Sequence, residues 1–187
     1  MAPRQSFEDR IAAIVAAEEA RAGEPSELYL TAVHASAALR RRHDALEAIR
    51  AAKAAEEGSA AQAEAMLRGS GEAAQAAICL YLAAASAQRF CTTHDREPGP
   101  LGLQRLAHLV HTTKLFRDAV MHWDEKTTRD PRTFIALTEM DMVVLAPPPK
   151  HQDKGSSVAT AITWAAFEMS ATRLYRWAAF KLHLGPR

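Results

Sequence analysis

The chain has 187 residues, 48% hydrophobic and 24% charged, which suits one globular domain, residues 1–187, with a hydrophobic core. Its 23 basic and 22 acidic side chains leave a net charge of +1, so no general positive field holds nucleic acid and any RNA site must be local. Two cysteines exclude a disulfide framework. The first ten residues do not resemble a signal peptide, and the most apolar stretch, 73–87, is too short to span a bilayer. We expect a cytoplasmic protein without membrane contact.

Helices dominate the first half of the chain, where alanine, the best helix former, recurs throughout. Ser6 can cap a first helix, and after a break at Gly23 and Pro25, Ser26 can cap a longer one. A segment that is apolar on nearly all sides is typical of the central helix of a bundle. The predicted helices are 6–21, 27–57, 60–67 and the apolar 73–89, with a turn at 68–71 between the last two.

The second half contains the least regular part of the sequence. A helix is predicted from Leu103 to Asp124, and the last helix from Val158 to Leu182. Between them, residues 126–157 hold four of the nine prolines and form a long irregular insertion. Within this insertion, 132–146 is apolar and fits either a short helix or an extended pair. The prediction is an all-α, up-and-down bundle of about five or six helices.

The helix 103–124 ends in a sequence with two chemically capable side chains, Arg117-Asp118-Ala-Val-Met-His122. Arginine can hold phosphate oxygens with its planar fork of donors, and histidine can take or give a proton near neutral pH. On a helical wheel Arg117 falls near the apolar stripe, which contains Leu106, Val110, Thr113 and Val120. An unpaired buried guanidinium is costly, so Arg117 needs a partner, and Asp118 lies on the wrong side to pair easily. This conflict indicates either a special site or a helix that is not regular at this point.

The polar face of the same helix carries Gln104, His108, His111, Asp118 and His122. Histidines three or four positions apart can hold zinc or nickel. One helix rarely supplies a full ligand set, however, and no Glu-x-x-His motif occurs on another helix. The prediction is therefore no metal and no cofactor, with the histidine face on a wet surface, at an interface or in a site.

Other basic and aromatic residues leave alternatives open. Arg40-Arg41-Arg42 are either a solvated face or phosphate contacts. Lys126 and Arg129 lie close to the motif in sequence, and with His111 they are candidate substrate-binding residues. The aromatic side chains of the last helix are expected in the core or at a dimer contact; they are Trp164, Tyr175, Trp177 and Phe180.

The sequence Arg117-Asp118-x-x-x-His122 resembles the signature of the HEPN superfamily of helical-bundle proteins. In that signature four to six residues separate an arginine from a following histidine, and Asn, Asp or His is favoured directly after the arginine. The run 123–125, Trp-Asp-Glu, also resembles the residues just beyond the histidine in some members. The resemblance implies a metal-independent endoribonuclease of a bacterial defence or toxin system. It implies Arg117 and His122 as catalytic residues, with Asp118 orienting one of them.

The resemblance also implies a mechanism and partners. His122 would remove the proton of a ribose 2′-hydroxyl, and Arg117 would hold the charge of the transition state, leaving a 2′,3′-cyclic phosphate. The implied partners are RNA, a second copy of the chain in a homodimer, and an antitoxin or regulatory protein. Position 124 is Asp, whereas some HEPN toxins have a tyrosine there that an antitoxin modifies. The alternative is a non-catalytic helical module that binds a nucleotide or a protein.

Overall fold

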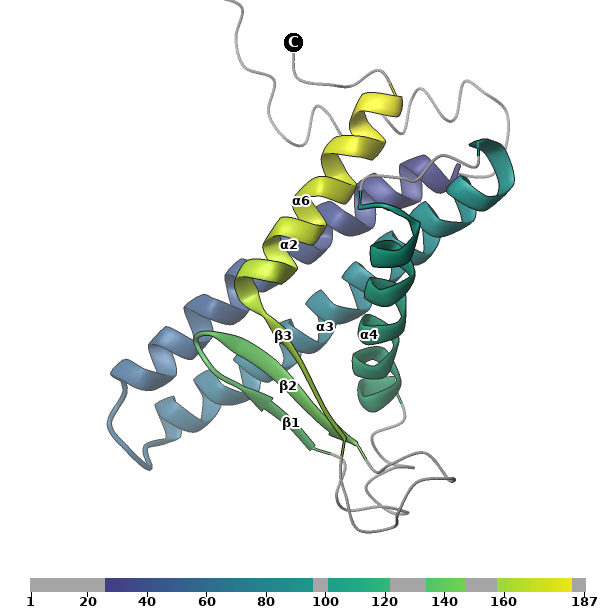
Figure 1. The fold of residues 1–187 in the computed structure, drawn as a ribbon. Helices are drawn as coiled ribbons and strands as arrows, with labels where there is room; N and C mark the ends of the chain where they lie inside the picture. Colours follow the sequence, from purple (N-terminus) through teal and green to yellow (C-terminus); the bar gives the residue numbers. More distant parts are fainter. Residues whose placement is uncertain (1–25, 96–100, 122–133, 147–157, 183–187) are drawn as a thin grey trace, which may run out of the picture.

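The computed structural model describes residues 26–95, 101–121, 134–146 and 158–182, and in these ranges it is mostly helical, as predicted (Figure 1). The predicted helix 6–21 lies outside the described residues. A sheet accompanies the helices, which an all-α bundle does not include. The described elements are α2 (Glu27–Ala54), α3 (Ala60–Phe90), the π-helical turn η1 (Cys91–Asp95), α4 (Leu103–Met121), β1 (Phe134–Leu137), β2 (Asp141–Ala146), β3 (Val158–Thr163) and α6 (Trp164–Lys181).

Helices α2 and α3 form a long antiparallel hairpin with alanine at most buried positions. The predicted cap at Ser26 is confirmed, because its side chain accepts a hydrogen bond from the Tyr29 amide at 3.3 Å. Ser59 caps α3 in the same way, accepting from the Gln62 amide at 3.1 Å. Small side chains on both helices let their backbones approach closely, and this alanine interface is the main packing contact of the bundle.

The predicted turn at 68–71 is wrong, because α3 continues through it from Ala60 to Phe90. Gly69 is buried against α2, and a Cβ atom at this position would lie 3.5 Å from Ala48 Cβ and from Ile49 Cγ1. Packing against α2 therefore outweighs the low helix propensity of the glycines. The central position predicted for the apolar part of α3 is confirmed, since α3 contacts α2, α4 and α6.

The sheet lies at one end of the bundle and runs from the first turn of α6 to the level of the C-terminal end of α4 (Figure 1). Its three strands are antiparallel, with β2 in the centre. The segment 132–146, for which the sequence fits both a helix and an extended pair, contains the hairpin β1–β2. The prediction that residues 158–163 begin the last helix is wrong, because they form β3. Alternating β-branched residues favour that strand once β2 is there to pair with it.

Trp164 joins the sheet to the helices. Its side chain is 3% exposed, its indole Nε1 donates to the Thr138 carbonyl at 2.9 Å, and its amide donates to the Met140 carbonyl at 2.9 Å. Its own carbonyl accepts from Arg42 Nε of α2 at 3.1 Å. The β1–β2 turn, the start of α6 and the middle of α2 are therefore fixed together. In the part of the chain that the structure describes, no helix is both long and apolar enough to cross a bilayer.

Candidate functional site

Arg117 and Asp118 lie in the last turns of α4, with side chains that are 29% and 25% exposed. Arg117 Nε donates to Asp118 Oδ1 at 2.8 Å, and Arg117 Nη2 donates to the same oxygen. The expectation that Asp118 lies on the wrong side to pair with Arg117 is therefore wrong. Adjacent helix positions are about 100° apart, but the long arginine side chain curls around the helix far enough to reach the carboxylate.

Tyr81 of α3 is a second partner of this guanidinium. The Arg117 Cζ atom lies 4.5 Å from the centroid of the Tyr81 ring, which is a cation–π contact. The contact explains how Arg117 tolerates a position beside the apolar stripe of α4. The hydrogen bond to Asp118 is the main cause that raises the pKa of Arg117 above its ordinary value, while burial opposes it. The site therefore keeps a positive charge throughout the physiological pH range.

The Arg117 guanidinium still has donors to offer. Asp118 accepts one N–H each from Nε and Nη2, and the Tyr81 side chain is a further hydrogen-bond partner, so at least two of the five N–H donors remain. The planar group is held on one face by the tyrosine ring and at one edge by the carboxylate. Its remaining edge is suited to an oxygen of a phosphate or carboxylate group, both of which match the planar fork of arginine.

The structure describes only one of the other predicted site residues, His111. His111 lies on the open face of α4 with Gln104 and His108, and the exposure of all three agrees with the predicted polar face. His122, Lys126 and Arg129 lie outside the described residues, which end in this helix at Met121. Within the described ranges, no group of three His, Cys, Asp or Glu side chains is arranged to hold a metal ion.

The three consecutive arginines of α2 have three different roles. Arg41 forms an ion pair with Glu72 of α3 at 2.8 Å. Arg42 binds the Trp164 carbonyl and pairs with Glu168 of α6 at 2.7 Å, so it joins two helices. Arg40 is exposed and lines a pocket. Arg41 and Arg42 thus pair with carboxylates of the neighbouring helices α3 and α6.

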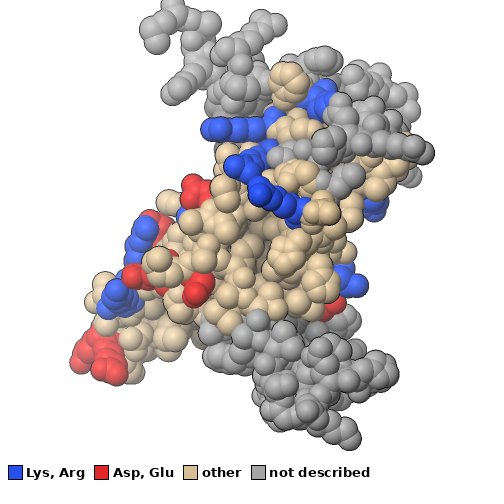
Figure 2. All heavy atoms as spheres, in the orientation of Figure 1, with Lys and Arg blue, Asp and Glu red and all other residues tan. Residues whose placement is uncertain are grey.

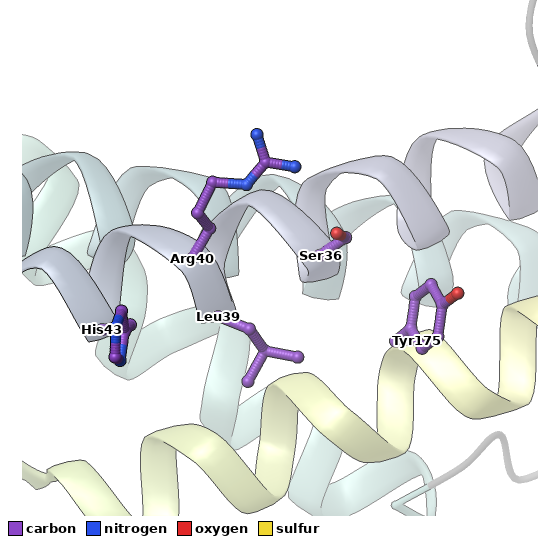
Figure 3. Close-up of a pocket in the computed structure, with 5 residues that line it drawn as sticks. All are labelled: Ser36, Leu39, Arg40, His43 and Tyr175. Carbon is purple, nitrogen blue, oxygen red and sulfur yellow. The ribbon is translucent and has the colours of Figure 1, made fainter. Parts of the chain in front are cut away.

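A pocket of about 440 Å³ lies between α2 and α6, lined by Ser36, Leu39, Arg40, His43 and Tyr175. In Figure 3 the ring of Tyr175 extends from α6 toward α2, while the Arg40 side chain points away from α6. Sequence reasoning missed this pocket, although its four α2 residues share one helix face at spacings of three and four. The predicted core role of Tyr175 is only partly met, since its side chain is half-buried at the pocket wall.

The surface that Figure 2 shows carries an uneven distribution of charge. Lys and Arg gather over α6, where Arg173 and Arg176 are exposed. Acidic side chains are more frequent toward the end of the α2–α3 hairpin, where Glu56, Glu57 and Glu64 are exposed and basic side chains lie among them. The α6 arginines lie on a different element from Arg117 of α4.

Comparisons with protein-family models, with curated proteins and with solved structures found no significant match. The resemblance to the HEPN superfamily therefore rests on the motif 117–122 and on the helical layout.

Proposed function

We propose that the protein is a metal-independent endoribonuclease of HEPN type that acts in bacterial defence or as a toxin. One observation supports this most strongly: Arg117 is held in place by Asp118 and Tyr81, yet keeps an edge of its guanidinium for an incoming oxygen. A catalytic cation needs this fixed orientation, because it must not reorganise when charge develops. His122 is the next residue in the chain after Met121, the last residue of α4.

The reaction is a transfer within the RNA strand. The His122 imidazole takes the proton of a ribose 2′-hydroxyl, and the 2′-oxygen forms a new bond to the adjacent phosphorus. The bond from phosphorus to the 5′-oxygen breaks, which gives a 2′,3′-cyclic phosphate and a free 5′-hydroxyl. A protonated imidazole supplies the proton to the leaving oxygen, and Arg117 stabilises the additional negative charge on the phosphate.

Two imidazoles are needed in this scheme, one as base and one as acid. A homodimer supplies both if the His122 residues of the two copies meet at one site. Each proton transfer of this kind contributes typically about 10²–10⁴-fold to the rate. Asp118 orients Arg117, and His111, Lys126 and Arg129 bind neighbouring phosphates.

The test is RNA cleavage by the full chain with a chelator present. We expect wild-type protein to cleave mixed RNA and His122→Ala to be inactive with an unchanged circular dichroism spectrum. Arg117→Ala should also be inactive, whereas Arg173→Ala, which removes an exposed arginine from α6, should leave cleavage unchanged. Equal cleavage by wild type and His122→Ala would exclude the nuclease assignment.

The α2–α6 pocket favours a second candidate, a non-catalytic module that binds a nucleotide or a partner protein. Its lining combines an aromatic ring, an aliphatic side chain and basic groups, a combination common in small-molecule sites. This candidate predicts that ligand binding depends on Tyr175 and is unaffected by His122→Ala. A Tyr175→Ala variant compared with His122→Ala therefore separates the two candidates.

A further inference from the structure

Every third residue of α4 from Arg105 to Arg117 is basic, and no acidic residue occurs in this helix before Asp118. The five basic residues of this series are Arg105, His108, His111, Lys114 and Arg117. The long helices α2 and α3 mix charges; α2 has Asp44 and Glu47, and α3 has Glu64 and Glu72. Residues three apart are neighbours on a helix surface, about 5–6 Å apart at Cβ. The five side chains therefore form one continuous row that winds about 240° around α4, here called the basic ridge.

The basic ridge is accessible over most of its length. All its members except Arg117 are exposed, and α4 packs chiefly on α3, with a smaller contact to β2. Within the described part of the chain, no hydrogen bond or ion pair engages the side chains of Arg105, His108, His111 or Lys114. Four nitrogen-bearing side chains thus face solvent without a competing carboxylate, and the fifth member is the proposed catalytic arginine.

We propose that the basic ridge binds the backbone of single-stranded RNA and leads it to Arg117. This inference rests on the proposed function and assigns its substrate class and path. Rows of residues three apart cross a helix at about 45°, and the ridge covers about 18 Å along the axis at about 1.5 Å per residue. Its steps are of the same order as the separation of successive phosphates in an extended strand, so consecutive side chains can meet consecutive phosphates.

A single strand fits the ridge better than a duplex. Double-stranded RNA presents two backbones, and proteins that bind it contact both across a wide surface. The ridge is one row of nitrogen-bearing side chains on one helix, which matches one backbone. The chemistry agrees, because the attacking 2′-oxygen must move into line with the leaving oxygen, and base pairing in an A-form helix prevents that movement.

The binding test uses a short fluorescent 2′-O-methyl RNA, which lacks the attacking hydroxyl and cannot be cleaved by this mechanism. The ridge variant is Arg105→Gln with Lys114→Gln, and the matched control is Arg173→Gln with Arg176→Gln, which removes the same charge from α6. We expect the ridge variant to weaken binding about tenfold and to reduce the slope of log affinity against log salt by about 1.4, or about 0.7 per phosphate contact. The control should bind as wild type does.

Three results would overturn the inference: no binding by wild type, no loss in the ridge variant, or an equal loss in the control. Equal, ridge-dependent binding of a duplex of the same length would overturn the single-strand assignment. With cleavable RNA, the ridge variant should raise KM and leave kcat unchanged. RNA binding that depends on the ridge, without cleavage that depends on His122, would exclude the nuclease assignment and support RNA binding by the ridge. His122-dependent cleavage that is the same in wild type and the ridge variant would support the nuclease assignment and exclude RNA binding by the ridge.

Discussion

The Arg117 guanidinium rests on the ring of Tyr81, with Cζ 4.5 Å from the ring centroid. This contact joins the motif on α4 to the central helix of the bundle. Because Arg117 is also bound at one edge by Asp118, its position is set from two directions, one within α4 and one from α3. A side chain with this many rotatable bonds would otherwise sample many orientations at a partly exposed position.

Replacement of Tyr81 tests the cation–π contact. Tyr81→Leu removes the aromatic face, so we expect cleavage to fall and the free energy of unfolding to drop by about 1 kcal/mol. Tyr81→Phe keeps the ring and should retain near wild-type values of both. Cleavage assays with chelator and urea unfolding of the three proteins measure the two effects. Equal behaviour of the Leu and Phe variants would show that the ring is not what holds Arg117.

Asp118→Asn tests the second contact. The variant keeps an acceptor oxygen but loses the charge, so we expect kcat for RNA cleavage to fall about tenfold, equivalent to about 1.4 kcal/mol. Glu168→Gln is the matched control, because it removes the charge of a carboxylate that pairs with a different arginine, Arg42. Wild-type kcat in Asp118→Asn would mean that Asp118 does not orient Arg117.

Arg42 and Arg41 should differ strongly in their contribution to stability. Arg42 is 18% exposed and binds both Glu168 and the carbonyl of buried Trp164, so Arg42→Met should lower the free energy of unfolding by about 2 kcal/mol. Arg41 is 45% exposed, and solvent screens its pair with Glu72, so Arg41→Met should lower the free energy of unfolding much less than Arg42→Met does. Urea unfolding of both variants gives the comparison. Equal losses would contradict the structural role given to Arg42.

The glycines of α3 offer a gain in stability. A Cβ at Gly71 meets nothing within 4 Å, and one at Gly69 makes ordinary contacts with α2. Gly71→Ala and Gly69→Ala should each raise the free energy of unfolding by about 0.5–1 kcal/mol. Gly58, in the connection between α2 and α3, has φ +74°, so Gly58→Ala should instead be destabilising. Thermal unfolding shows whether each variant is more or less stable than wild type. Destabilisation by Gly71→Ala would contradict a helix through this position.

His34 on α2 should make stability depend on pH. Burial lowers its pKa from the ordinary value of 6.5, so the unfolded chain takes up a proton before the folded protein does. Stability is therefore complete above the unfolded pKa and decreases as the pH falls below 6.5 toward the folded pKa. His34→Gln should lose less stability than wild type between neutral and mildly acidic pH. Identical losses in parallel urea titrations would remove this role of His34.

Helix boundaries were predictable where a side chain marks them. Ser26 caps α2 as its sequence position indicates. The helical wheel of α4 placed His108 and His111 on its polar face, and both are exposed. Local preference in the strand 158–163 is mixed, because two alanines favour a helix and four β-branched residues favour a strand. Pairing with β2, a tertiary contact, decides between them. The turn predicted at 68–71 failed for the same reason, since burial of Gly69 against α2 is a tertiary effect.

The candidate site was only partly predictable. The motif identified Arg117 and Asp118, and the wheel indicated that Arg117 needs a partner, but nothing in the sequence pointed to Tyr81. That contact depends on how α3 and α4 pack, which is a property of the fold. The α2–α6 pocket was missed because Arg40 lies in a run of three arginines whose different roles appear only when α3 and α6 are in place.

Thr163 is both the last residue of β3 and the N-cap of α6, where its hydroxyl accepts from the Ala166 amide at 3.1 Å. No spacer separates the strand from the helix, so the direction in which β3 ends sets the direction in which α6 begins. Tyr175 lies about three turns further along α6, so the seating of the sheet also determines where this wall of the α2–α6 pocket stands.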